Sequence, residues 1–199
     1  AHAVAPSRPA SFTVSQTPVA TGANYTLAWS AASGSGTITY DLRRRLAGGA
    51  WAVAYSGTAL SRTESQAVAG PWEYRLRACN AAAECSAYTA NLPVSVQVPV
   101  GIQAFSATPS TSAAGERVLL SWNTEGATAV TIDQGVGAVA TGGSVAVSPA
   151  ATTTWTLSAT GFTGNGTGTV TRSVQVSVES APAGAQAGTP QVEPPADTS

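Results

Sequence analysis

The stretches Tyr25-Thr26-Leu27-Ala28-Trp29 and Val118-Leu119-Leu120-Ser121-Trp122 decide how this chain folds. In each stretch, large apolar side chains occupy every second position and the last of them is a tryptophan. A period of two is the pleat of a β-strand with one buried face. The two tryptophans lie about 93 residues apart, close to the length of one small sandwich domain. The sequence therefore predicts an all-β fold with two antiparallel β-sandwich domains in tandem.

The composition is typical of short strands joined by tight turns. Of the 199 residues, 10% are charged, against about 25% in ordinary soluble domains. The net charge of −1 creates no global field that attracts nucleic acid or an anionic membrane. No stretch reaches the roughly 18 continuous apolar residues of a membrane span. We therefore expect no nucleic-acid partner and no membrane insertion.

The first 98 residues show about seven segments of alternating polarity, separated by turn residues. In one of them, Ile38, Tyr40 and Leu42 share a face, and in another Tyr74, Leu76 and Ala78 do. Short strands with a turn every ten or so residues favour an antiparallel sandwich. The expected strands are 11–15, 24–30, 37–45, 51–55, 60–68, 72–80 and about 88–98.

This part of the chain resembles a fibronectin type III domain. The resemblance rests on Trp29 in the second strand, on a Tyr-x-Leu strand after it, and on the segment Tyr74-Arg75-Leu76-Arg77-Ala78-Cys79-Asn80. In that family the last segment is strand F, which lies beside strand C, and its tyrosine is the corner tyrosine, here Tyr74. The resemblance implies a sandwich over residues 9–98.

The two cysteines, Cys79 and Cys85, are six positions apart. This offset can bring them opposite each other across a β-hairpin, where a disulfide closes a short loop. A disulfide implies an oxidising compartment. The alternative is a dithiol metal or redox site, but the spacing is not Cys-x-x-Cys and the one histidine is His2. We expect the disulfide, and paired cysteines here also resemble a variant of the domain found in secreted bacterial proteins.

The second half of the chain resembles the bacterial immunoglobulin-like (Ig-like) domains of extracellular proteins. The resemblance rests on Gly115-Glu116-Arg117-Val118-Leu119-Leu120-Ser121-Trp122, Val130-Thr131-Ile132-Asp133 and Thr152-Thr153-Thr154-Trp155-Thr156-Leu157. It implies a sandwich over 102–178, after a linker 99–101 whose proline cannot donate to a sheet ladder. Residues 1–8 are expected to be a disordered lead. Residues 179–199, rich in Pro, Ala, Gly and Gln, are expected to be a disordered linker or tail.

The sequence shows no arrangement of residues that is typical of a catalytic site. A nucleophilic triad needs a base beside its nucleophile, most often histidine, and His2 lies in the expected lead. The acidic residues are scattered, without the pairing of a glycosidase or the spacing of a calcium loop. We therefore expect no enzyme, no catalytic residue, no metal site and no cofactor, and we interpret the acids as solvated surface groups.

Arginines and tryptophans are the candidate binding residues. If Tyr40 and Leu42 point inward, Arg43 and Arg45 point outward. By the same alternation Arg75 and Arg77 point outward, and the resemblance to fibronectin type III domains implies that the two strands, C and F, are neighbours. Four arginines on one face can hold carboxylates or sulfates. The alternative is a solvated face neutralised by Asp41 and Glu73.

Exposed tryptophans can stack on sugars, although core or edge packing is the commoner role, and we expect Trp51, Val53 and Tyr55 to share one face. Arg44 falls on the inward phase without an evident reason. The possible partner-binding residues are Arg43, Arg45, Arg75, Arg77, Trp51 and Trp72.

These observations favour a non-catalytic extracellular stalk or interaction module. Lysine is absent beside abundant alanine and arginine, which is typical of GC-rich bacterial genomes, and Ala1-His2-Ala3 fits the end of a signal peptide as well as an arbitrary start. We expect a secreted or cell-surface protein whose chain continues into a larger one, as in the N-terminal part of secreted bacterial surface or toxin-type proteins with Rhs/YD repeats. The partner that we expect is a protein or a glycan at a cell surface. The alternatives are an accessory module of a secreted polysaccharide-degrading enzyme and a subunit of an extracellular filament.

Overall fold

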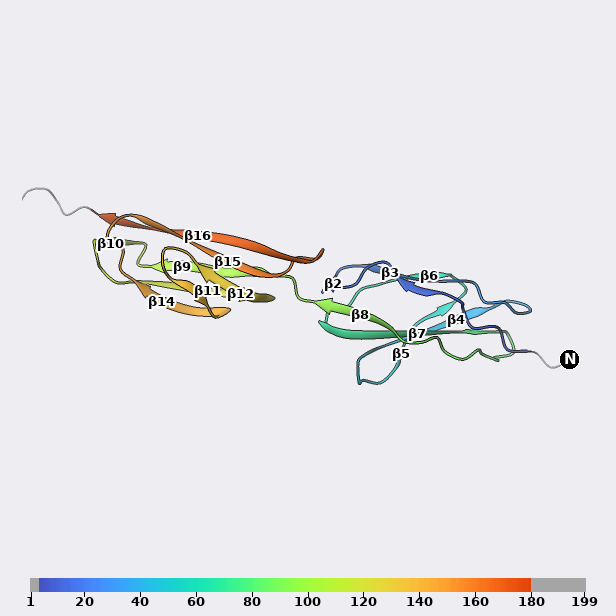
Figure 1. The fold of residues 1–199 in the computed structure, drawn as a ribbon. Coiled ribbons are helices and arrows are strands. Elements are labelled where there is room, and N and C mark those ends of the chain that lie inside the picture. Colours follow the sequence, from blue (N-terminus) through green and yellow to red (C-terminus); the bar gives the residue numbers. More distant parts are fainter. Residues whose placement is uncertain (1–3, 180–199) are drawn as a thin grey trace, which may run out of the picture.

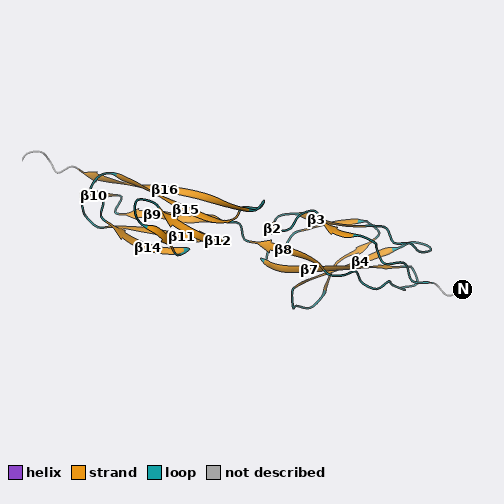
Figure 2. Cartoon of the chain, viewed as in Figure 1, coloured by secondary structure: helices purple, strands orange, loops and turns teal. Residues whose placement is uncertain are grey.

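The computed structural model describes residues 4–179, which form strands, turns and loops (Figure 2). The strands build two β-sandwiches that are arranged end to end (Figure 1). Within the described range, no helix has the length and apolarity needed to cross a membrane. The tandem all-β fold predicted from the alternation is confirmed. The expected tail at 180–199 and the segment Ala1-His2-Ala3 lie outside the described residues.

The first sandwich has a three-stranded and a five-stranded sheet. The smaller sheet has the order β1-β3-β6, and the larger has the order β2-β8-β7-β4-β5. Strands β4 and β7 are antiparallel neighbours, as the resemblance implied for strands C and F. The bounds are β1 Phe12–Val14, β2 Val19–Ala20, β3 Tyr25–Trp29, β4 Thr39–Leu46, β5 Ala52–Gly57, β6 Ser61–Glu64, β7 Gly70–Cys79 and β8 Leu92–Gln97.

The inward residues of both sheets form the core of the first sandwich. Alternate residues of β3 and β7 are buried because the pleat turns them toward the opposite sheet. The hydroxyls of Tyr25 and Tyr74 are hydrogen-bonded to each other, and the Gln66 amide donates to Tyr74 at 2.9 Å. Burial raises the pKa of both tyrosines. Tyr74, the expected corner tyrosine, is therefore anchored by side chains of the other sheet and of the β6–β7 loop.

The second sandwich repeats the strand order of the first. Its sheets are β9-β11-β14 and β10-β16-β15-β12-β13, so every strand occupies the place of the strand eight numbers before it. Trp29 on β3 and Trp122 on β11 thus lie on equivalent strands, as their matching sequence contexts predicted. The bounds are β9 Gly101–Thr108, β10 Thr111–Ala113, β11 Val118–Glu125, β12 Ala127–Ile132, β13 Gly137–Val139, β14 Gly142–Val147, β15 Thr153–Phe162 and β16 Thr167–Glu179.

Each sandwich has a separate apolar core. The core of the second contains Val118, Leu120 and Trp122 from one sheet and Trp155 and Leu157 from the other. All five side chains are at most 7% exposed. Burying a side chain of this size contributes about 1.5–3 kcal/mol to folding, so each domain carries its own driving force.

Two segments differ from the sequence prediction. Residues 4–8, expected in a disordered lead, lie along the first sandwich, where Pro6 is buried and Ser7 exchanges hydrogen bonds of 2.8 Å with Ser33. The last strand begins at Leu92 rather than near Tyr88. The residues before it run along the edge of β7 through a mixture of backbone and hydroxyl hydrogen bonds, which satisfies β7 without a regular ladder.

Candidate functional site

The outer surface of β4 and β7 carries the charged residues expected to share a face. Their register sets Arg43 opposite Arg75, Asp41 opposite Arg77, and Arg45 opposite Glu73. The residues between them on both strands are buried or half-buried, which leaves these six pointing outward. With two aromatic residues described below, we call this surface the arginine face; its members are Asp41, Arg43, Arg45, Trp51, Glu73, Arg75, Arg77 and Tyr88.

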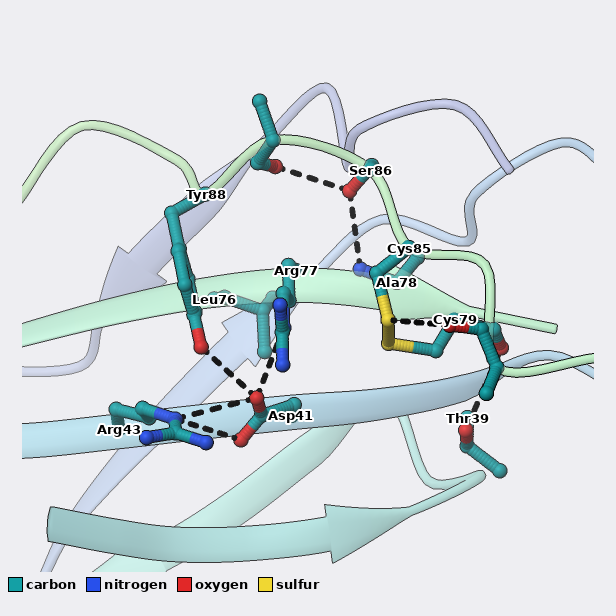
Figure 3. Close-up of polar contacts among 12 residues, drawn as sticks. Thr39, Asp41, Arg43, Leu76, Arg77, Ala78, Cys79, Cys85, Ser86 and Tyr88 are labelled. Carbon is teal, nitrogen blue, oxygen red and sulfur yellow. Dashed lines mark hydrogen bonds and ion pairs between the residues drawn. A yellow bond between two sulfur atoms is a disulfide. The ribbon is translucent and has the colours of Figure 1, made fainter. Parts of the chain in front are cut away.

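Asp41 is the centre of a hydrogen-bonded cluster on this face (Figure 3). Its carboxylate accepts from Arg43 Nε at 3.2 Å, from Arg77 Nε at 2.9 Å and from the Tyr88 hydroxyl at 2.9 Å. A separate ion pair joins Arg45 Nε to Glu73 at 2.6 Å. The acids that the sequence offered as neutralising groups therefore bind three of the four arginines.

Guanidinium groups and aromatic rings alternate across the arginine face. The Arg45 and Arg75 Cζ atoms lie 4.5 and 4.1 Å from the centroid of the Trp51 ring. The Arg75 and Arg77 Cζ atoms lie 4.1 and 4.8 Å from the centroid of the Tyr88 ring. The sequence Arg45, Trp51, Arg75, Tyr88, Arg77 is thus a ladder of cation–π contacts, each worth about 0.5–1 kcal/mol at exposed sites and more when desolvated.

Arg75 occupies the middle of the ladder and differs from the other three arginines. Among residues 4–179, no carboxylate lies within ion-pairing distance of it. Its Nε atom is buried and has no hydrogen-bond acceptor. Arg43 faces it directly across the two strands, and like charges in that position repel. The centre of the arginine face therefore has uncompensated positive charge.

A disulfide fixes the segment that carries Tyr88. Cys79 and Cys85 are bonded, and the loop between them closes on Asn80, whose side-chain oxygen accepts from the Ala82 and Glu84 backbone amides at 3.0 Å. Beyond the bond, the Ser86 hydroxyl accepts from the Ala78 amide at 3.1 Å (Figure 3). The predicted disulfide is present, and it ties the residues leading to Tyr88 against β7.

Replacing both cysteines with serine is expected to lower the free energy of unfolding of the first domain by about 2 kcal/mol, because the short loop gains conformational freedom in the unfolded state. Urea denaturation followed by tryptophan fluorescence measures this, with unreduced and reduced wild type as the paired comparison. Identical midpoints for oxidised and reduced protein would contradict the expectation.

The Asp41 cluster makes part of the stability of the first domain dependent on pH. Burial alone raises the pKa of the Asp41 carboxyl, but the hydrogen bonds from Tyr88, Arg43 and Arg77 together lower it below the ordinary value of 3.8. A lowered folded-state pKa adds stability that is fully present above the unfolded-state value and is lost as the pH falls through the folded-state value.

We therefore expect the wild type to lose more stability than Asp41→Asn between pH 5 and pH 2. Asparagine cannot bind a proton in this range, so the variant lacks this component of the acid-induced loss. Urea midpoints measured at intervals across this range for both proteins test the prediction. Parallel curves for the two proteins would show that the Asp41 carboxylate is not preferentially stabilised by folding.

The two candidate tryptophans, Trp51 and Trp72, lie in different places. Trp51 lies on the arginine face, where two guanidinium groups contact its ring. Trp72 is on the inward phase of β7, packs against the core of the first domain, and donates from Nε1 to the Val68 carbonyl at 3.0 Å. The structure therefore joins Trp51 to the four candidate arginines and leaves Trp72 apart from them.

Trp51, Val53 and Tyr55 do not share one face, contrary to the sequence expectation. Tyr55 pairs with Leu42 and Val53 pairs with Arg43, so Ala54 is an extra residue in the ladder. Such a β-bulge shifts the alternation by one. Tyr55 consequently packs against the core beside Trp29, while Val53 is 57% exposed.

An ion pair to a buried glutamate explains the inward arginine for which the sequence offered no reason. Arg44 reaches from β4 across the sandwich to Glu64 on β6, with 2.5 Å between Nη1 and Oε2. The Glu64 side chain is 4% exposed and also accepts from Arg62 Nε at 3.2 Å. Glu64 is therefore an interior acid rather than the solvated surface group that the sequence suggested, and a charge on the inward phase of a strand was the signal for a buried partner.

Clusters of potential metal ligands and surface hollows are where a catalytic site could lie in the described residues. No three His, Cys, Asp or Glu side chains in the range 4–179 gather closely enough to hold a metal ion. Three surface hollows stand out, at the N-terminal segment, in the second sandwich and at the junction of the domains. The residues that line them include no carboxylate, histidine or cysteine.

Comparison with known proteins shows the fold. Neither a family model nor a curated protein sequence matches the chain. Among solved structures, it is similar to the N-terminal eight Ig domains of Down Syndrome Cell Adhesion Molecule (DSCAM) isoform 1.30.30, with a TM-score of 0.55, 19% identity, and coverage of 89% of this chain and 25% of that one. The D1-D4 ectodomain fragment of ICAM-5 gives a TM-score of 0.54, 12% identity, and coverage of 86% and 48%.

Fibronectin type III domains are also among the neighbours. The FN1-FN3 domains of chicken CNTN1 align with a TM-score of 0.41 and 12% identity, covering 89% of this chain and 69% of that one. The chain spans about a quarter of the DSCAM fragment and about half of the ICAM-5 fragment. Identities this low speak for the fold alone, and the two structures with TM-scores above 0.5 show a tandem of Ig-like β-sandwiches.

Proposed function

We propose that this chain is a non-catalytic extracellular stalk and interaction module, the spacer part of a larger secreted bacterial surface or toxin-type protein. One observation carries the proposal: the linker between the two sandwiches is built into the second of them. A spacer must hold the rest of its protein at a set distance, and a bound linker provides that stiffness.

The linker is held by close backbone contacts. Val100 is 8% exposed and belongs to the core cluster of the second sandwich, and its amide donates to the Phe162 carbonyl at 2.7 Å. Gly126, at φ +63°, lies so close that a Cβ atom would come within 2.5 Å of the Val98 carbonyl oxygen and 2.6 Å of the Pro99 carbonyl oxygen. Only the residues between Gln97 and Gly101 separate β8 from β9.

A second contact joins the two domains directly. The Gln16 amide, from the β1–β2 loop of the first sandwich, donates to the Gly164 carbonyl in the β15–β16 hairpin of the second at 3.1 Å. Together with the bound linker, this contact restrains bending and rotation about the long axis seen in Figure 1. Both are features that favour a spacer over a flexible tether.

The fold and the disulfide support an extracellular setting. Disulfides persist in oxidising compartments, and the bond between Cys79 and Cys85 is part of the first domain. The DSCAM structure is that of a cell adhesion molecule and the ICAM-5 structure is that of an ectodomain fragment. A role in contact with other proteins outside the cell is the corresponding proposal here.

An accessory module of a polysaccharide-degrading enzyme is the second candidate. Trp51 is the observation that bears on it, because a half-buried indole on an outer sheet face is a platform for a sugar ring. Two arginines already contact that ring. Glycan-array binding that disappears in Trp51→Ala, with Trp72→Ala as the comparison, would favour the enzyme module over the stalk.

Surface labelling tests the proposal directly. Antibodies raised against the two-domain chain are expected to label intact, unpermeabilised cells of the producing organism, or its culture medium, and to detect a product longer than 199 residues. Labelling only after permeabilisation would overturn the proposal. Light scattering separates the stalk from a filament subunit, since the stalk is expected to stay monomeric at high concentration.

A further inference from the structure

The arginine face has an excess of positive charge that is concentrated at its centre. Four arginines oppose two acids, and the two acids bind the arginines at the two ends, Arg77 and Arg45, as well as Arg43. Arg75 has no anionic partner among the described residues and has a buried Nε atom without an acceptor. An unsatisfied buried donor on a charged group is costly, so the Arg75 guanidinium has less internal compensation than those of the other three arginines.

We propose that the arginine face is a docking site for an acidic loop of a partner protein, with a carboxylate of that loop bound at Arg75 and Arg43. This inference rests on the proposed function, for which it names the interaction surface. A guanidinium fork binds a carboxylate through two parallel hydrogen bonds. Arg43 and Arg75 face each other across the strands, so one carboxylate between them also relieves their mutual repulsion.

Arg75 is held ready for such a ligand. Its Cζ atom lies 4.1 Å from the ring centroids of both Trp51 and Tyr88, so the two rings restrain the position of the group. The disulfide and the hydrogen bond from Tyr88 to Asp41 hold the Tyr88 ring in place in turn. Binding by a pre-oriented side chain loses less conformational entropy than binding by a mobile one, so the ladder lowers the cost of recognition.

The pattern of charge favours a protein loop over a sulfated glycan. Asp41 and Glu73 lie on the same face, and they repel a densely charged polyanion while they can pair with basic residues of a mixed loop. The stacking surface that a sugar would use on Trp51 is in contact with Arg45 and Arg75. A single carboxylate among polar neighbours complements this alternation of signs.

Two peptides provide the test, the blocked pentapeptide Gly-Glu-Gly-Glu-Gly and its counterpart with glutamine in place of glutamate. Each is titrated into the oxidised two-domain protein at low salt while the arginine Nε–Hε resonances are followed by NMR. We expect the Arg75 resonance to shift and saturate with the glutamate peptide, and binding of the glutamine peptide to be at least tenfold weaker. A sulfated disaccharide in a third titration is expected to be weaker than the glutamate peptide.

Arg75→Gln is expected to weaken binding of the glutamate peptide at least tenfold, and Arg75→Lys to weaken it as well, since lysine keeps the charge but loses the planar fork. Arg172→Gln, on β16 of the second domain, is the matched control and should bind like wild type. Thermal unfolding of each variant establishes that it is folded.

Three outcomes overturn the proposal. They are an Arg75 resonance that does not respond to the glutamate peptide, equal loss of binding in Arg172→Gln, and tighter binding of the sulfated disaccharide through the same residues. The last outcome would assign the face to a glycan. A failure here leaves the bound linker and the surface labelling untouched, so it is distinguishable from a failure of the proposed stalk.

Discussion

Arg44→Met is expected to lower the free energy of unfolding of the first domain by about 2 kcal/mol. Removing one partner of a buried ion pair leaves the other charge buried and incompletely solvated, which costs about 3–5 kcal/mol in a fully buried pair. The Glu64 side chain is 4% exposed, but that of Arg44 is 35% exposed and Arg62 still contacts Glu64. We reduce the expected loss for these two reasons. Urea denaturation at pH 7 measures it.

Arg62→Met is the matched control, because it removes the other cation that contacts Glu64. Its side chain is 48% exposed, and an ion pair of that kind is worth at most about 1 kcal/mol. The double variant Arg44→Met with Glu64→Leu should recover much of the stability, since apolar residues often replace a buried pair without loss. Equal losses in Arg44→Met and Arg62→Met would show that the Arg44 pair does not bridge the sandwich as described.

The period-two alternation predicted the elements that the core determines. In a strand that is buried on one face, apolar residues alternate with polar ones, so the sequence shows which side chains point inward. Tyr25, Leu27 and Trp29 were placed inward in this way, and they are at most 5% exposed. The same logic placed Arg75 and Arg77 outward. Where the buried face of a strand follows the alternation, the local sequence is sufficient to predict which side chains point inward.

The arrangement of the arginine face depends on contacts that alternation does not encode. Tyr88 reaches Asp41 only because the segment after Cys85 leaves the strand pattern and runs along β7 through hydroxyl contacts. Tyr55 points inward only because Ala54 forms a bulge. The partner of Arg44 lies on the opposite sheet, 20 residues away in sequence. Each of these features is a tertiary contact, and no periodicity within one strand predicts it.

Gly126→Ala is expected to detach the linker from the second sandwich. The residue has φ +63°, which costs an alanine about 1 kcal/mol. The new Cβ atom would also meet the Val98 and Pro99 carbonyl oxygens at 2.5 and 2.6 Å, and both are backbone atoms that cannot rotate away. Overpacking of this kind costs about 1–3 kcal/mol, so the total loss for the second domain is about 2–4 kcal/mol unless the linker moves. Urea denaturation gives the loss, and small-angle X-ray scattering gives the spread of interdomain distances.

Gly135→Ala separates the cost of the positive φ from the cost of the collision between the added Cβ atom and the linker. This glycine has φ +83°, but its added Cβ atom would meet nothing within 4 Å. It therefore carries the cost of the backbone conformation without the collision, and it should leave the scattering profile unchanged. If the two variants lose the same stability and scatter alike, the linker is not held at Gly126. If only Gly126→Ala broadens the distribution of distances, one hydrogen atom in place of a methyl group sets the stiffness of the tandem, and the stalk depends on a backbone contact rather than on a large interface.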